Sequence, residues 1–419
     1  MSVQKIQVLQ PGYYEKFSCI GGACEDVCCR DWNIVIDKNT YDRCRSIKDK
    51  RFVEKFLSSV KRNKGVDANT VNYAKFIMRE DGFCNFIRDD GLCEIHGNHG
   101  AKYLGNVCMT YPRKCCMMQQ GLHEFSLVMS CPEVIRVALF RPEIMTFKLT
   151  EIPFDASNRL LRLRNQLKTD YEKTARFTPY SFKIRESCID ILQCRTIRLP
   201  DRILAIGMML SKLTGLESVE KEDLEKLVGT YVSAAIAGIF NNALADTADN
   251  AEVAADMKGV LLLMAGKFTE YGRIGRVNKL LFDAMSDHVP ESGELPFVAM
   301  HEKLEEFVPK YWTPFLEQKG YILEHYFVNL VFSTMFPFKY GEDIDIYQHF
   351  IILAEQYAMM RMIFCVCAEK QNGITDELII SVLNGMAMYS EHSKKAKDIA
   401  EIYVKNGFDS LAYMSFLLK

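Results

Sequence analysis

The sequence lacks a charge excess of either sign. Its 52 basic and 54 acidic residues nearly cancel, so no overall field draws the chain to nucleic acid or to an anionic membrane, and we expect no nucleic-acid partner. Low-complexity segments are also missing, and 48% of the residues are hydrophobic against 25% charged. This composition is typical of a globular protein, and the length of 419 residues predicts two domains.

Signals for export and membrane insertion are equally scarce. Residues 1–11 contain neither the long apolar stretch nor the small-residue cleavage site of a secretory signal, so we expect a cytoplasmic protein. The segment 227–245 carries no charge and is long enough to span a membrane. Its asparagines and its glycine and alanine content favour a helix packed inside a bundle. We therefore expect no membrane span.

Two cofactor-binding motifs are absent. The chain has no glycine-rich strand–turn–helix fingerprint of a Rossmann fold. The radical S-adenosylmethionine spacing Cys-x3-Cys-x2-Cys is incomplete, because Cys24 and Cys28 satisfy the first gap but Asp31 stands where the third cysteine belongs. The ordinary forms of both sites are therefore excluded.

Cysteine, by contrast, is abundant and unevenly placed. Eleven of the fifteen cysteines fall between Cys19 and Cys131. In a long chain without an export signal they indicate metal ligands, redox thiols or small buried hydrophobic residues, and their clustering favours metal ligands. The densest stretch holds four thiols, and Gly21 and Gly22 within it let the backbone curl so that the sulfurs converge. The predicted metal ligands are Cys19, Cys24, Cys28, Cys29, Cys84, Cys93, Cys108 and Cys131.

These thiols exceed what one four-ligand site needs. Either two metal centres share the region, or one centre draws on both cysteine stretches while other cysteines pack nearby. The adjacent pair Cys28 and Cys29 does not form the short paired knuckles of a structural zinc site. The spacing therefore favours an iron-sulfur cluster, of the 4Fe-4S type, with zinc as the alternative. His96 and His99 lie just after Cys93, but such histidines more often lie at the surface or cap a helix.

The hydrophobic spacing predicts a mostly α fold in two domains. Residues 1–142 are expected to form an irregular, cysteine-rich metal-binding domain with short strands, and residues 143–419 an all-helical bundle with room for a protein substrate. An irregular solenoid is the second choice. Strands are expected at 32–37, 73–79 and 122–130, an Asp-Gly hairpin at 84–93, and helices at 40–62, 131–140, 158–176, 181–193, 201–213, 223–244 and 254–271. Pro132 and Glu133 place Cys131 at a helix N-terminus.

The cysteine motifs resemble those of the FliB-like flagellin lysine N-methylase family, which shares a cysteine-rich domain with a wider zinc- or iron-chelating group. The matching segments are Cys19-x4-Cys24-Glu-Asp-x-Cys28-Cys29-x2-Trp32, Cys84 to Cys93, Cys108-x2-Tyr111-Pro112-Arg113 and Ser130-Cys131-Pro132-Glu133. A weaker likeness extends around residues 185–213. The resemblance implies methyl transfer from S-adenosylmethionine to lysine nitrogens of flagellin, with an iron-sulfur cluster required.

The methyl-donor site is assigned to two residues near the cysteines. Arg113 is placed to pair with the carboxylate of the donor, or else with an acidic neighbour in the fold. Tyr111, together with Tyr103 and Trp32, either shapes a lysine channel or packs structurally. No catalytic residue is assigned. Two other functions stay open, a zinc-stapled protein-binding module without activity and an iron-sulfur redox protein.

Overall fold

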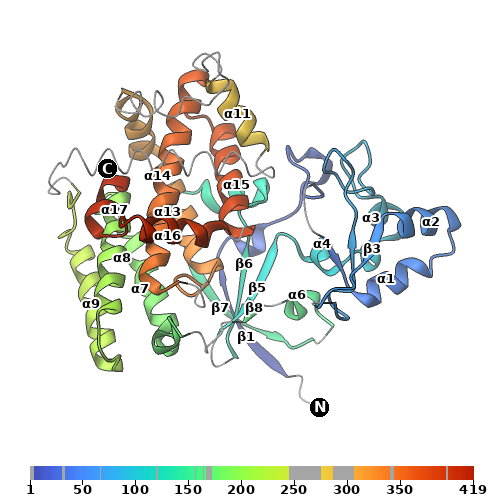
Figure 1. The fold of residues 1–419 in the computed structure, drawn as a ribbon, viewed down its shortest axis with the longest axis horizontal. Coiled ribbons are helices and arrows are strands. Elements are labelled where there is room, and N and C mark those ends of the chain that lie inside the picture. The colour runs from blue at the N-terminus through green and yellow to red at the C-terminus, as the bar shows by residue number, and fades with distance from the viewer. Residues whose placement is uncertain are drawn as a thin grey trace.

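The computed structural model describes residues 4–30, 34–66, 68–118, 121–155, 157–163, 165–166, 172–244, 275–285, 306–339, 344–392 and 395–419. Three parts follow one another across the view in Figure 1: a large helical bundle, a central sheet and a small lobe built from the early part of the chain. The mostly α fold with short strands near the N-terminus confirms the predicted class.

The small lobe holds a sheet in the antiparallel order β2-β4-β3, formed by Val35–Ile36, Ala74–Phe76 and Val60–Arg62. Phe52, Phe56 and Phe86 are buried at its core. The predicted strand 73–79 is confirmed by β4, and β2 lies within 32–37, of which residues 32 and 33 fall outside the described part.

The single helix predicted over 40–62 is wrong. The structure has α1 (Lys38–Arg45), α2 (Lys50–Ser58) and then strand β3 in its place. The break has a local cause, because the Asp49 carboxylate accepts hydrogen bonds from the backbone N–H groups of Arg51 and Phe52 and so caps a new helix. An aspartate that caps a helix start competes with continuing the helix that precedes it.

The central sheet has the order β7-β1-β6-β5-β8. Its strands are β1 (Lys5–Pro11), β5 (Arg113–Met117), β6 (His123–Leu127), β7 (Phe147–Pro153) and β8 (Asn165–Gln166). Strand β1 runs parallel to β6 and antiparallel to β7 over seven residue pairs. Strand β6 confirms the extended segment predicted at 122–130. Strands β7 and β8 follow residue 142 yet join this sheet, so the sheet extends across the predicted domain boundary. The division into two domains at this residue stays a prediction.

Besides α5 (Pro132–Leu139), the helices of the bundle are α6 (Arg159–Arg162), α7 (Ser181–Leu192), α8 (Leu199–Thr214), α9 (Lys221–Ile236), α11 (Gly275–Met285), α13 (Thr313–Ser333), α14 (Ile346–Gln371), α15 (Asp376–His392), α16 (Lys395–Lys405) and α17 (Leu411–Leu418). Helices α5 to α9 of the bundle begin within two residues of the positions that the sequence indicated. A π-helical turn, η8 (Val308–Trp312), leads into α13. The predicted helix 254–271 lies outside the described residues.

Two predicted helices are shorter than expected. Helix α9 ends at Ile236 rather than 244, because Gly238 adopts φ +72° and its N–H bonds back to Ala235, a left-handed ending that glycine permits. The helix predicted over 158–176 is α6 alone in its first part, followed by β8 and, after residues 167–171 outside the described part, a short 3-10 helix at Ala175–Tyr180.

Helix α14 lies at the centre of the bundle. It begins with a capping box between Asp345 and Gln348, and α8 approaches it so closely that a Cβ on Gly207 would lie 2.3 Å from the Phe350 ring. It is the one helix in the described part that is long and apolar enough to cross a membrane, and 94% of its most apolar window is buried inside the protein. That burial is typical of the central helix of a bundle.

One ion pair fastens the sheet to the bundle. Arg185 on α7 donates from Nη2 to both carboxylate oxygens of Glu124 on β6, at 2.8 Å each, and both side chains are 2% exposed. Its Nη1 lies 3.2 Å from the Met118 sulfur, and the guanidinium lies over the Phe332 ring. A charge pair removed from water in this way strongly destabilises the fold when one partner is lost.

We predict that Arg185→Met lowers the free energy of unfolding by about 3–5 kcal/mol, because Glu124 is left as a buried unpaired charge. Adding Glu124→Leu to that variant should recover much of the loss. Urea unfolding measures both values. Lys183→Met on the same helix is the control, since its pair with Glu186 is exposed and is worth at most about 1 kcal/mol. Equal losses in the two single variants would contradict the assigned role.

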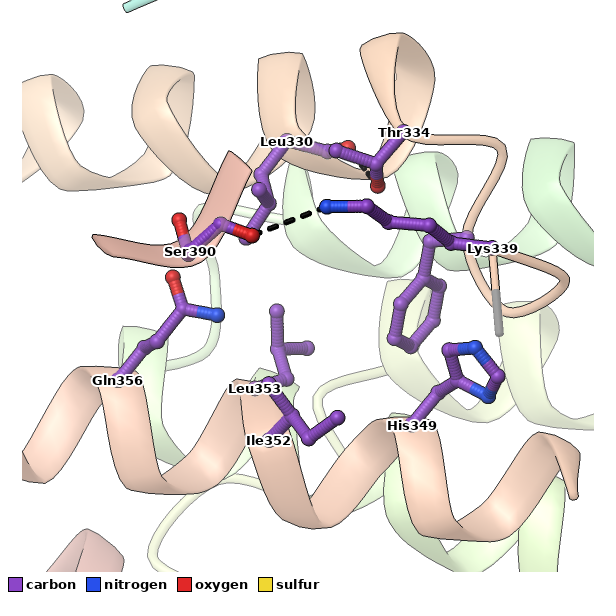
Figure 2. Close-up of a pocket in the computed structure, with 9 residues that line it drawn as sticks. Leu330, Thr334, Lys339, His349, Ile352, Leu353, Gln356 and Ser390 are labelled. Carbon is purple, nitrogen blue, oxygen red and sulfur yellow. Dashed lines mark hydrogen bonds between the residues drawn. The ribbon is translucent and has the colours of Figure 1, made fainter. Parts of the chain in front are cut away.

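A buried carboxyl group sits inside α14. Glu355 is fully buried, and neither carboxylate oxygen has a hydrogen-bond partner among the described residues. Burial raises the pKa of Glu355 to about 8. The adjacent Gln356 lines a cavity of about 30 Å³ between α13, α14 and α15 (Figure 2), across which Lys339 Nζ donates to the Ser390 carbonyl at 2.9 Å. That volume holds about one water molecule.

We predict that Glu355 makes the fold less stable as pH rises from about 5 to 8. Folded Glu355 keeps its proton up to pH about 8, whereas the unfolded chain releases it near pH 4.5, so the folded state binds more protons across that window and loses stability as pH increases. Glu355→Gln removes this pH-dependent contribution to stability. The free energy of unfolding of the variant, relative to that of the parent, should be about 3 kcal/mol higher at pH 8 than at pH 5.

Thermal or urea unfolding of both proteins across that pH range measures the difference. The neighbouring Tyr389 and Tyr403 stay protonated throughout, because burial raises the pKa of each well above 10. His349 on the same helix has its pKa lowered to about 4 by burial, and it titrates alike in parent and variant. Parallel stability curves would show that Glu355 does not titrate in this window.

Candidate metal centre

The first cysteine stretch is held in a tight loop against the second. Gly21 has φ +59° within the short 3-10 turn Gly21–Ala23, and its N–H lies 3.4 Å from the Cys19 sulfur. A Cβ on Gly22 would lie 2.8 Å from the Asp90 carbonyl oxygen. Only glycine allows this approach, so the two glycines that the sequence singled out bring the loop onto the hairpin that carries Cys84 and Cys93.

The predicted hairpin is confirmed. Gly91 adopts φ +75° at the turn, Leu92 N–H donates to the Asp90 carboxylate at 3.0 Å, and Ile87 pairs with Cys93 across the hairpin. The backbone N–H of Cys84 donates to the Cys29 carbonyl at 2.8 Å. The last bond joins the two cysteine stretches directly through their backbones.

The sulfurs of these segments lie within electrostatic reach of one another. The thiol of Cys29 donates to Cys28, which lowers the pKa of Cys28 and raises that of Cys29. Burial raises the pKa of Cys108, and the charges of Cys93, Cys84 and Cys28 raise it further. Several thiolates in one place repel each other, so they ionise together only when a cation compensates them.

Cys131 joins this neighbourhood from the helical side. It is the N-terminal cap residue of α5, as predicted. Burial raises its pKa to about 12, the backbone amides of Val134 and Glu133 oppose that rise, and the charges of Cys24 and Cys28 add to it. Its surroundings therefore favour a thiolate only in the presence of added positive charge.

An ion-pair chain that the sequence reading missed ties the loop to α5. Arg136 contacts Glu25 with one nitrogen and Glu133 with another, the latter at 3.2 Å. Glu25 follows Cys24 directly, and Glu133 follows Cys131 by two residues. The spacing of Glu133 and Arg136 on one helix face was the available signal, but their link to Glu25 depends on the tertiary fold.

Several other cysteines and one histidine nearby pack in the protein interior or against aromatic rings. Cys44 packs in the core of the small lobe, and its thiol donates to the Tyr103 carbonyl at 3.4 Å. Cys115 and Cys116 are buried in the central sheet. The His99 ring packs on Phe52 with centroids 4.3 Å apart. Among the residues that the structure describes, no three Cys, His, Asp or Glu side chains converge closely enough to hold a single metal ion.

The two residues assigned to the methyl donor lie on opposite sides of Pro112. The Tyr111 hydroxyl is 3.2 Å from Ser130 Oγ, and burial, followed by the charge of Cys131, raises its pKa well above 10. The Arg113 guanidinium is exposed and lies over the Phe17 ring at 5.2 Å. Trp32 falls outside the described residues. The ligand and donor assignments of all these residues stay predictions.

The fold and this site define a mostly helical protein with a thiol-rich N-terminal region. Its residues 185–417, more than half of the chain, match the FliB lysine N-methylase C-terminal domain. The chain therefore belongs to the FliB lysine N-methylase family, as its cysteine motifs predicted.

Curated relatives agree with this membership. A lysine-N-methylase of Salmonella typhimurium strain LT2 is 28% identical over 175 residues, which cover 38% of this chain and 42% of that protein. The flagellar biosynthetic protein FliU of Salmonella muenchen is 29% identical over 147 residues, which cover 34% of this chain and 83% of FliU. The chain thus spans less than half the length of the lysine-N-methylase it matches. No solved structure matches the chain.

We predict that Cys28→Ser lowers the iron and acid-labile sulfide content of anaerobically purified protein at least several-fold, because a serine hydroxyl is a poor ligand for iron. Cys44→Ser is the matched control, since its hydroxyl can still donate to the Tyr103 carbonyl and it lies outside the predicted ligands. Metal and sulfide analysis with visible absorption reads out both. If the parent protein contains zinc and no sulfide, the thiols bind zinc and the prediction of an iron-sulfur cluster is wrong.

Proposed function

We propose that this protein transfers a methyl group from S-adenosylmethionine to the side-chain nitrogen of lysines on a protein substrate, with flagellin as the first candidate. The single observation that carries the proposal is the family match over residues 185–417. The names of the relatives support it: one is a lysine-N-methylase, and the other is a flagellar biosynthetic protein. The same proposal assigns an iron-sulfur cluster to the N-terminal thiols.

The residues present fit such a cluster by their chemistry. Cysteine thiolates are the usual ligands of iron-sulfur clusters, and Cys28, Cys29, Cys93 and Cys108 lie close enough for the charge of one to shift the pKa of another. When bound, iron supplies a Lewis-acidic position for the amino and carboxylate groups of the donor's methionine moiety. The positive charge of the iron would also compensate the repulsion between the crowded thiolates.

The chain itself must supply the geometry of methyl transfer. A lysine amine has to be neutral and in line with the sulfonium carbon, in a pocket that excludes water. Tyr111 suits such a pocket, because its raised pKa keeps the hydroxyl protonated as a hydrogen-bond donor beside Ser130 and Cys131. Arg113, exposed at the start of β5, has the charge to pair with the donor's carboxylate.

We predict that coexpression with a cognate flagellin adds methyl groups to its lysines and that Cys28→Ser abolishes this transfer. The variant loses a cluster ligand while the helical bundle stays folded, so activity should fall with the cluster rather than with the fold. Intact-protein and peptide mass spectrometry of the flagellin scores each added methyl group. Cys44→Ser is the control and should retain transfer.

The possible outcomes separate the competing functions. Equal methylation by the parent and by Cys28→Ser would refute a cluster-dependent mechanism. Absence of methylation in every strain, with a cognate flagellin present, would favour a binding or redox role. Binding of S-adenosylmethionine, measured by calorimetry on the anaerobic protein, then distinguishes an enzyme without its substrate from a protein that never uses the donor.

A further inference from the structure

A short turn, residues 128–131, joins strand β6 to helix α5. The N–H of Val128 donates to the Pro112 carbonyl at 3.0 Å, and the N–H of Cys131 donates to the Val128 carbonyl at 3.4 Å. The ladder between β5 and β6 ends before the turn, and the helix begins after it. The turn therefore lies outside both regular elements, and the position of Cys131 depends on the side chains that contact the turn.

Cys131 differs from several other predicted ligands in what it packs against. It packs against the large hydrophobic core that contains the bundle helices. Four predicted ligands instead belong to, or pack against, the core of the small lobe: Cys29, Cys84, Cys93 and Cys108. Burial raises the pKa of Cys131 and that of Cys108, and the charge of Cys28 raises both further, so Cys28 lies within electrostatic reach of both sides. The placement of Cys131 against the small lobe thus decides whether one centre can use thiols from both sides.

Asn384 holds this turn from the helical bundle. It lies on α15, within residues 185–417 that match the FliB C-terminal domain, and its Nδ2 donates to the Ser130 carbonyl at 2.7 Å. Ser130 is 2% exposed, and a buried carbonyl of this kind requires a hydrogen-bond donor. The Ser130 carbonyl and the Cys131 nitrogen belong to one planar peptide group. The bond from Asn384 therefore fixes the plane from which the Cys131 side chain departs.

A second buried asparagine makes the same kind of bond at a different point. Asn329 on α13 donates from Nδ2 to the Leu127 carbonyl at 3.3 Å, and its Oδ1 accepts from the Tyr13 hydroxyl. Leu127 is also held by the sheet, because it pairs with Arg113 in the ladder between β6 and β5. Asn329 thus anchors a strand residue, whereas Asn384 contacts the turn residue next to the predicted ligand.

We propose that Asn384 is a positioning residue of the metal centre, whose side-chain amide sets the place of Cys131 relative to the thiols of the small lobe. The inference rests on the metal centre that the proposed function assigns to these thiols. All eight predicted ligands precede residue 185, so the domain shared with the family holds a ligand in place without supplying one. Replacing a residue that supports a metal ligand typically changes metal affinity about 10–100-fold.

Two variants at this position test the role. Asn384→Leu removes the amide while nearly keeping the side-chain volume, and Asn384→Ser puts a shorter polar group in its place. In the full-length protein purified anaerobically, both variants should release their metal to a chromogenic chelator at least about ten-fold faster than the parent. When the metal is iron, the visible and electron paramagnetic resonance spectra of the cluster should also change, because the Cys131 sulfur is displaced. Far-UV circular dichroism checks that the helical bundle stays folded.

Asn329→Leu is the matched control, since it removes the same kind of bond from a more deeply buried asparagine. Urea unfolding should show a loss of stability at least as large as in Asn384→Leu, while metal release and spectra stay those of the parent. Unchanged release in both Asn384 variants, or equally fast release in Asn329→Leu, would overturn the inference and leave the metal centre standing. A parent protein without metal would overturn the metal centre itself and this inference with it.

Discussion

The ion pair between Glu124 and Arg185 is the contact on which the arrangement of the molecule most depends. It joins the middle strand of the central sheet to the first long helix of the bundle, and both side chains are removed from water. A buried pair of this kind contributes little net free energy but penalises every arrangement that separates its members. The match to the family domain begins at Arg185, so this domain starts at the residue that anchors the bundle to the sheet.

The thiol region depends in turn on that anchored sheet. Cys108 and Cys131 flank strands β5 and β6, while Cys28 and Cys29 reach them from a loop that two glycines hold against the 84–93 hairpin. This loop is held by backbone hydrogen bonds and by the Arg136 ion pairs rather than by a large apolar core. Segments ordered in this way gain most from a bound metal, because metal binding adds folding free energy where hydrophobic burial is small.

The sequence predicted the parts of this arrangement that arise from local chemistry. The Asp-Gly hairpin, Cys131 at the start of α5, and helices α7 and α8 follow from turn residues, a proline at the first helical position and apolar spacing. It failed where a side chain interrupts a regular pattern, as Asp49 does between α1 and α2. It also could not reveal pairings such as β1 with β7, because register between distant strands is fixed by tertiary packing.

Helix α5 connects the thiol region to a buried ion-pair network, in which Arg195 and Arg202 donate to the Glu324 carboxylate. Its first residue follows Cys131, the Leu139 carbonyl near its end lies 3.3 Å from His325 Nδ1, and the Pro142 carbonyl just beyond accepts from Arg195. Eight helical residues span about 12 Å. Because His325 and Arg195 flank Glu324, this network and the N-terminal cap of α5 are positioned by one element. Contiguity of this kind is not evidence of energetic coupling, but it means that a displacement of α5 cannot reposition Cys131 without also shifting the carbonyls that contact His325 and Arg195.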